Sequence, residues 1–245
     1  MKSVPLVIGH ACAAGEAPAN TLAGVRACLD SGADAMEIDV RLSADNVPVL
    51  LHDETLDRTT NLSGPVRGYS VADLQAADAG GGEPVPSLAE VLDLVAGRMA
   101  VFCELKATVD MPELDQSLAG AVCSLIESLG ATDWVGIHSF GLEIVGAARR
   151  HAPGVSAAVI SPPVFGENRR ALFNAAVVRG AQAVSVHHSS VDAGFVLAAR
   201  RRQLRVWSWT PDEEGEWARL TVAGVDGIIT NLPTALASFL GQRGD

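Results

Sequence analysis

Two acidic residues within an apolar stretch are the first sign of chemistry in this chain of 245 residues. Glu37 and Asp39 lie two apart in the run from Ala35 to Val40, which reads AMEIDV. Side chains two apart in a β-strand point to the same face, so the two carboxylates are expected to project together. Two carboxylates on an otherwise apolar strand are costly unless a positive charge compensates them. We therefore expect a bound divalent cation beside this pair.

Further ionisable residues fall at the ends of other apolar runs. His10 follows the first run of the chain, His52 follows the short run after the acidic pair, and His138 ends a later run. Glu104 and Lys106 are again two apart within one run, so they are expected to share a face. Histidine exchanges a proton near neutral pH, because its ordinary pKa is about 6.5. Carboxylates, a lysine and histidines together indicate a metal-assisted acid–base site.

The elements that must position these residues alternate along the chain. Short apolar runs predict strands at Val4–Gly9, Ala35–Val40, Met99–Leu105, Trp134–His138, Val155–Ile160, Ala183–Val186, Leu204–Ser208 and Gly227–Ile229. Amphipathic stretches predict helices at Thr21–Ser31, Ser87–Val95, Glu113–Leu129, Leu142–His151, Glu167–Arg179, Asp192–Arg202, Asp212–Ala223 and from Pro233 onward. Eight strands, each followed by a helix in about 250 residues, predict an α/β fold of the (β/α)8 TIM-barrel type. In such a barrel the carboxyl ends of the strands carry the active site.

One segment interrupts this alternation. Arg41 to Pro86 separates the second strand from the second helix, whereas ordinary connections of this kind have about 2–6 residues. It contains an expected hairpin strand, Val47–Leu51. Long connections at this edge of a barrel are usually functional. We expect a small insertion over about residues 41–86 within a single domain that spans residues 1–245.

Composition narrows the classes of partner and compartment. The formal net charge of −11 argues against nucleic-acid binding, which requires a basic face. A bound metal ion can still make an anionic substrate acceptable, because it reverses the local potential. No apolar run reaches the roughly 18 residues that span a membrane, so no stable membrane insertion is expected. The four cysteines are scattered, without zinc-site or disulfide spacing, and a cytoplasmic location is expected.

The order of several short motifs resembles the glycerophosphodiester phosphodiesterase family over essentially the whole chain. The matching segments are GH at 9–10, PANT at 18–21, EIDV at 37–40, HD at 52–53, TLDRTT at 55–60, PSL at 86–88, ELK at 104–106 and GVDGIITN at 224–231. Each motif alone is weak, but their order and spacing together are specific. The resemblance implies a TIM barrel with a small insertion after the second strand.

The resemblance also implies a role for each matching residue. Glu37, Asp39 and Glu104 would hold one divalent metal ion, Mg²⁺ or Ca²⁺, both of which prefer oxygen ligands. His10 and His52 would be the general acid and base. The residues implied to bind the substrate are Lys106, Asn20, Trp207 and His138. The reaction implied is hydrolysis of a glycerophosphodiester, or a related small phosphodiester, to an alcohol and a phosphomonoester.

Three segments depart from the family pattern. His10-Ala11-Cys12 stands where the family has His-Arg-Gly, Ala19 stands where the family has glutamate, and Thr210 stands where an asparagine is usual. The missing arginine removes a bidentate phosphate contact that lysine cannot reproduce. We expect either a different substrate or lower activity toward ordinary glycerophosphodiesters.

Several alternatives remain open at this point. Glu37 and Asp39 could pair with Arg41 instead of a metal ion, and His52 could be a hairpin residue without a role. His138 could be an ordinary rim histidine, and Trp207 a core tryptophan. The scaffold also fits a lyase or transferase that ends at a cyclic phosphate, or a non-catalytic binding protein. The expected partner is a small phosphodiester, and a homo-oligomer is left open.

Overall fold

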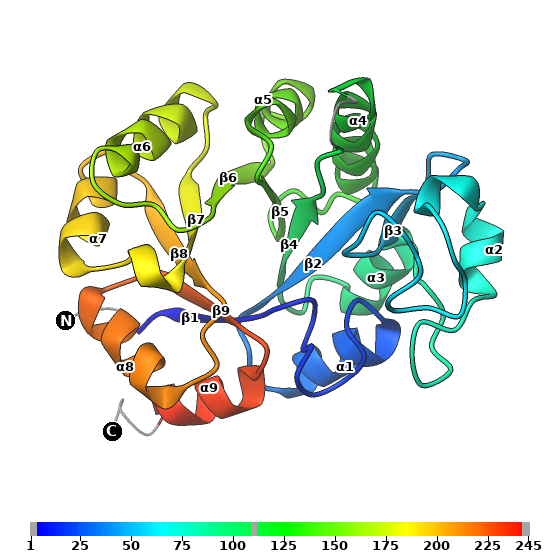
Figure 1. The fold of residues 1–245 in the computed structure, drawn as a ribbon, viewed down its shortest axis with the longest axis horizontal. Coiled ribbons are helices and arrows are strands. Elements are labelled where there is room, and N and C mark those ends of the chain that lie inside the picture. Colours follow the sequence, from blue (N-terminus) through cyan, green and yellow to red (C-terminus); the bar gives the residue numbers. More distant parts are fainter. Residues whose placement is uncertain (1–3, 109–111, 242–245) are drawn as a thin grey trace.

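The computed structural model describes residues 4–108 and 112–241, and within them parallel strands close into a barrel (Figure 1). The strands are β1 (Leu6–Gly9), β2 (Ala35–Leu42), β4 (Ala100–Leu105), β5 (Val135–Ser139), β6 (Ser156–Ser161), β7 (Ala183–His187), β8 (Arg205–Trp209) and β9 (Gly227–Thr230). Each strand pairs in parallel with its neighbours in chain order, and β1 closes the barrel by pairing with both β2 and β9. The predicted (β/α)8 TIM barrel is confirmed.

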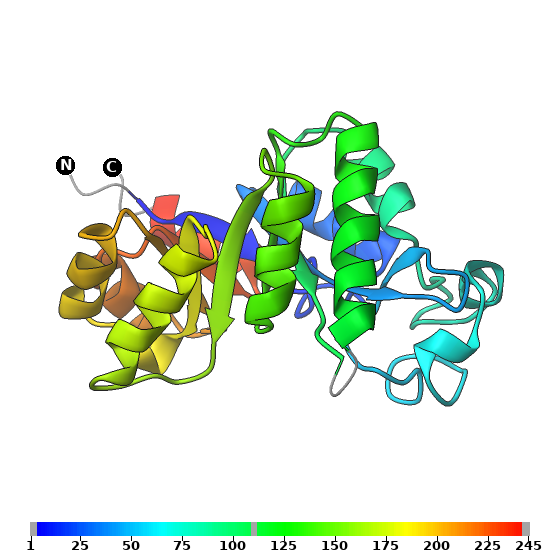
Figure 2. The same ribbon diagram turned by 90° about the horizontal axis from the view of Figure 1, so that it is seen from above.

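Helices follow the strands and cover the outside of the barrel (Figures 1 and 2). They are α1 (Leu22–Asp30), α3 (Leu88–Val95), α4 (Pro112–Ser128), α5 (Leu142–His151), α6 (Asn168–Val178), α7 (Ala193–Arg200), α8 (Glu214–Ala223) and α9 (Pro233–Gly241). A capping box fixes the start of α3, because the Ser87 hydroxyl accepts from Glu90 N while the Glu90 carboxylate accepts from Ser87 N. None of the described helices is long and apolar enough to cross a membrane.

The expected insertion lies between β2 and α3. It contains β3 (Pro48–Leu50), which pairs antiparallel with the end of β2, a 3₁₀ turn η1 (Val66–Gly68) and the short helix α2 (Val71–Gln75). In Figure 1 these elements lie beside the carboxyl end of β2. A small apolar cluster of the insertion's own residues, with Leu56 and Leu74 fully buried, packs it independently of the main core. The prediction of one domain extends to terminal residues outside the described part and stays a prediction.

The barrel interior is divided into an apolar floor and a polar mouth. Ile8, Trp207 and Ile229 belong to the cluster that fills the floor, and the Phe102 ring lies 4.2 Å from that of Trp207, centroid to centroid. The larger core lies between the strands and the surrounding helices. Polar side chains of β2 and β4 lie above the floor, and Glu37, Asp39 and Glu104 are buried there.

Candidate active site

The three predicted metal-binding carboxylates meet in the barrel interior. Asp39 of β2 is the register partner of Glu104 of β4, and Glu37 lies two residues before Asp39 on the same face. All three side chains are buried. The strand alternation seen in the sequence therefore does bring these acids together, because neighbouring parallel strands carry inward-pointing residues at the same level.

Lys106 compensates two of the acids directly. Its Nζ lies 2.7 Å from Asp39 Oδ1 and 2.6 Å from Glu104 Oε1. Burial alone would lower the pKa of Lys106, but the charges of Asp39 and Glu104 outweigh burial and raise it. Burial, aided by the nearby acids, raises the pKa of Glu104.

Asn20 holds Asp39 in place. Its Nδ2 donates to Asp39 Oδ2 at 2.7 Å, and its Oδ1 accepts from Asp39 N at 3.0 Å. Asp39 therefore has both carboxylate oxygens occupied, one by Asn20 and one by Lys106. Asn20 was expected to bind substrate, and the structure places both ends of its amide on Asp39.

Glu37, Glu104 and His138 form the group that could hold a metal ion among the described residues. One ligand atom from each lies within 4.8 Å of the others. Glu37 Oε2 accepts from Ala11 N at 2.9 Å, while Oε1 lies 3.5 Å from His138 Nε2. Burial alone would raise the pKa of Glu37, but His138, His10 and Lys106 together lower it. His138, expected to contact substrate, thus lies where Asp39 was expected as the third ligand.

His10 directly follows β1, and the turn after β9 fixes its ring. Its Nδ1 lies 2.7 Å from Asn231 Oδ1. Asp212 sets the orientation of that amide, because its carboxylate accepts from both Asn231 Nδ2 at 2.6 Å and Asn231 N at 2.8 Å. Nδ1 of His10 must then carry the proton, which leaves Nε2 for proton exchange. Burial lowers the pKa of His10, but Glu37 and the Asn231 hydrogen bond outweigh burial and raise it.

His52 comes from the insertion and is more open to solvent. Its side chain is 52% exposed, and Nδ1 lies 2.7 Å from Asp53 Oδ1. Asp53 is held in turn by Arg58, whose Nε lies 2.5 Å from Asp53 Oδ2. That hydrogen bond to Arg58 is the main cause of the lowered pKa of Asp53. Asp53 stays ionised beside His52 and orients the ring.

Two cavities open on this group, and His10 and His52 line both. One, of about 250 Å³, also contacts Glu37, Glu104, Lys106 and His138. The other, of about 330 Å³, is lined by alanine, leucine and valine side chains together with Asn20, Asp39 and Arg58. Of the departures from the family pattern, Ala11 and Ala19 line the second cavity and Thr210 lines the first. The histidine pair therefore lies at the boundary between the two spaces.

Sequence reasoning selected Trp207 as a pocket residue, and the structure places it below the pocket. Trp207 is buried in the barrel floor, whereas Trp209 and Phe140 line the 250 Å³ cavity with ring centroids 5.9 Å apart. The sequence also gave no indication that Asn231 and Asp212 belong to the site. The segment reading GVDGIITN was recognised as a motif, but nothing in it indicated contact with His10.

Comparisons with known proteins agree on one family. A model of the glycerophosphoryl diester phosphodiesterase family matches residues 10–235. A glycerophosphodiester phosphodiesterase of Caldanaerobacter subterraneus subsp. tengcongensis is 28% identical, covering 98% of this chain and 99% of that protein. The crystal structure of a glycerophosphodiester phosphodiesterase from Agrobacterium tumefaciens superposes with a TM-score of 0.80 at 28% identity, covering 96% of this chain and 99% of that chain.

A further solved structure shares the fold. An Oleispira antarctica phosphodiesterase, in complex with the product sn-glycerol-3-phosphate, has a TM-score of 0.89 at 24% identity, with 97% of each chain covered.

Proposed function

The chain belongs to the glycerophosphoryl diester phosphodiesterase family, and on that premise we propose that it hydrolyses a small glycerophosphodiester to an alcohol and a phosphomonoester. It is a phosphoric diester hydrolase, and the substrate and mechanism are the proposal. The observation that carries it is the pair His10 and His52, which border the same cavities above three buried carboxylates. The product complex of the Oleispira antarctica phosphodiesterase supports a glycerol phosphate product.

We propose that one divalent cation binds among the carboxylates. The ionised forms of Glu37, Asp39 and Glu104 carry three negative charges, so Lys106 together with a protonated His10 still leaves an excess of negative charge in this buried site. Among the buried site atoms that the structure describes, Glu37 Oε1, Asp39 Oδ1 and both ring nitrogens of His138 form no hydrogen bond, although Asp39 Oδ1 is ion-paired with Lys106. The carboxylate oxygens of Glu37, Asp39 and Glu104 fit Mg²⁺ or Ca²⁺, which prefer oxygen ligands. The bound ion would polarise the phosphoryl group and offset its developing charge.

The ligand set is part of the proposal. Glu37 and Glu104 belong both to the set predicted from the sequence and to the cluster of nearby ligand atoms. Asp39, the third predicted ligand, is engaged by Lys106 and Asn20, whereas His138 offers a free ring nitrogen. We place Glu37 and Glu104 as the shared ligands, with Asp39 and His138 as the two candidates that complete the set.

The two histidines divide the proton transfers. His52, oriented by Asp53, takes the proton from the attacking oxygen as a new P–O bond forms. His10 gives its Nε2 proton to the leaving alkoxide as the other P–O bond breaks, and its raised pKa keeps that proton available near neutral pH. Lys106 lies on the wall of the same cavity, where its ammonium faces the charge of the phosphate.

The test is turnover of glycerophosphocholine followed by phosphorus NMR, with Mg²⁺, Ca²⁺ or Mn²⁺ added after chelation. We expect sn-glycerol 3-phosphate to accumulate only with metal, and His52→Ala or His10→Ala to lower kcat by about 10²–10⁴-fold. His151→Ala, an exposed histidine on α5, is the matched control. Unchanged turnover in both site variants would contradict the proposal, and a persistent cyclic phosphate would favour a lyase.

We also propose a cytoplasmic location for the enzyme. All four cysteines are buried free thiols, which suits a reducing compartment.

A further inference from the structure

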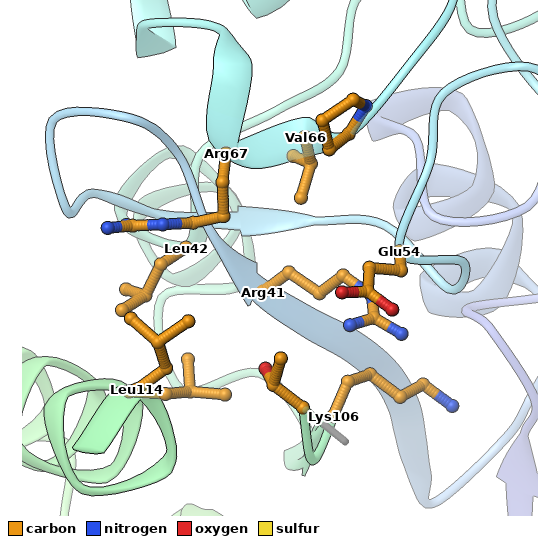
Figure 3. A pocket seen from close by; sticks show the side chains of 10 residues that line it. Arg41, Leu42, Glu54, Val66, Arg67, Lys106 and Leu114 are labelled. Carbon is orange, nitrogen blue, oxygen red and sulfur yellow. The ribbon is translucent and has the colours of Figure 1, made fainter. Parts of the chain in front are cut away.

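A third cavity, of about 340 Å³, lies between the insertion and α4 (Figure 3). We call it the lateral cavity and define it by Arg41, Glu54, Arg67, Lys106, Leu114 and Leu118. Lys106 also lines the 250 Å³ cavity, so the two cavities share this lysine as part of their walls.

The strands place a positive charge at the entrance to this cavity. Glu37, Asp39 and Arg41 alternate along one face of β2, and Lys106 follows Glu104 in the same way beyond β4. The two rows are in register, since Asp39 pairs with Glu104 and Lys106 N donates to Val40 O at 3.2 Å. The acidic side chains therefore lie in the barrel interior. Arg41 and Lys106 lie two residues further along, toward the carboxyl ends of the strands. Figure 3 shows Arg41 and Lys106 extending side by side from these strands.

The guanidinium of Arg41 has N–H groups that are available to bind a ligand. Its Nε donates to His52 O at 3.0 Å, and no described carboxylate forms an ion pair with its guanidinium. Arg67 adds a second cation, held at the rim by Ser43 O and Asn46 Oδ1. A guanidinium with free N–H groups suits a carboxylate or phosphate oxygen pair.

We propose that the lateral cavity receives the alcohol arm of the substrate and that Arg41 selects arms carrying an anionic group. Leu114 and Leu118 offer apolar contact to the carbon skeleton of the arm, and Arg41 repels a purely cationic arm such as choline. Glu54 lies toward the guanidinium of Arg41 in Figure 3, where it weakens the preference for an anion. This inference rests on the proposed hydrolysis, whose substrate class it narrows.

Two substrates that differ by a single carboxylate provide the test. Glycerophosphoserine and glycerophosphoethanolamine share every other group, so the ratio of their kcat/KM values isolates recognition of that carboxylate. We expect the wild type to favour glycerophosphoserine by about tenfold or more. Arg41→Met, which keeps the aliphatic stem and removes the charge, should lower the ratio about 10- to 100-fold.

Two further variants sharpen the result. Glu54→Gln removes the opposing charge and should raise the ratio. Arg205→Met makes the same change in net charge as Arg41→Met but at the amino-terminal end of β8, and should leave the ratio at its wild-type value.

The possible results distinguish selectivity for an anionic arm from the proposed hydrolysis itself. A wild-type ratio near one would overturn the inference while leaving the hydrolysis intact. An equal loss on both substrates in Arg41→Met would also overturn it, because Arg41 would then act through the His52 carbonyl. Failure of the wild type to turn over either substrate, with each metal ion supplied, would remove the proposed function and the inference together.

Discussion

Asn231 connects His10, the proposed general acid, to the rest of the barrel. Its Oδ1 accepts from His10 Nδ1, and Asp212 prevents the amide from turning over. We expect Asn231→Leu to lower kcat by about 10- to 100-fold, since His10 would lose both its orientation and its tautomer. Activity that depends on protonated His10 falls as the pH rises through the pKa of that residue. Loss of the Asn231 hydrogen bond lowers this pKa, so the falling limb of the kcat profile should move to lower pH.

A rate profile measured against pH distinguishes this role from simple packing. Asn174→Leu, on the exposed face of α6, is the control and should leave both kcat and the limb unchanged. A fall in kcat with an unmoved limb would mean that Asn231 supports the fold without tuning His10.

At the same scale, the sequence indicated which way side chains point but not how deep they lie. Trp207 and Trp209 are two apart on β8 and share a face, yet Trp207 packs in the floor while Trp209 lines the cavity. Depth depends on how the strands are staggered around the closed barrel, which no single strand encodes. The contact between His10 and Asn231 spans 221 positions, so local patterns carry no trace of it.

At the scale of the elements, a capping box that can be recognised in the sequence determines where α3 starts. Ser87 begins the helix through the capping box with Glu90, and it also forms an isolated bridge with Val49 of the insertion. We expect Ser87→Ala to lower the free energy of unfolding by about 1 kcal/mol, measured by urea denaturation. Ser117→Ala, an exposed position within α4, should change it by less than about 0.5 kcal/mol. Equal changes in the free energy of unfolding for the two variants would show that the cap at Ser87 makes no specific contribution.

The strands were predicted to within a few residues because apolar runs between helices are a local signal. Val4–Gly9 was expected and β1 spans Leu6–Gly9, while the hairpin strand expected at Val47–Leu51 is β3, Pro48–Leu50. The η1 turn and α2 were not predicted. They are held by the insertion's own apolar cluster and its turns, which depend on contacts within a long irregular segment.

The insertion's separate cluster has a consequence for activity. Leu56 is fully buried there, and His52 and Arg58 belong to the same segment. Leu56→Ala should cost about 2–5 kcal/mol of packing energy, concentrated in the insertion. We expect amide hydrogen exchange to accelerate over residues 48–75, with the barrel strands still protected, and kcat to fall because His52 loses its support. Leu197→Ala, at a half-exposed position on α7, is the matched control. Uniform loss of protection would show that insertion and barrel unfold as one unit.

For the whole molecule, the proposed cation would link the charge of the buried acids to stability. A ligand that binds only the native state at 100 times its Kd adds about 2.7 kcal/mol to the free energy of unfolding. At about 2–4 °C for each kcal/mol in a chain of this size, chelation should lower Tm by roughly 5–10 °C, and added Mg²⁺ or Ca²⁺ should restore it.

A double variant tests whether the carboxylates cause this response. Glu37→Gln combined with Glu104→Gln removes the charge of the two shared ligands, so its Tm should be insensitive to chelator. Glu127→Gln combined with Glu143→Gln, two exposed positions on α4 and α5, makes the same change in net charge and should keep the response. A wild type whose Tm ignores both chelator and metal would argue that Lys106 alone balances the cluster and that the proposed cation site is wrong.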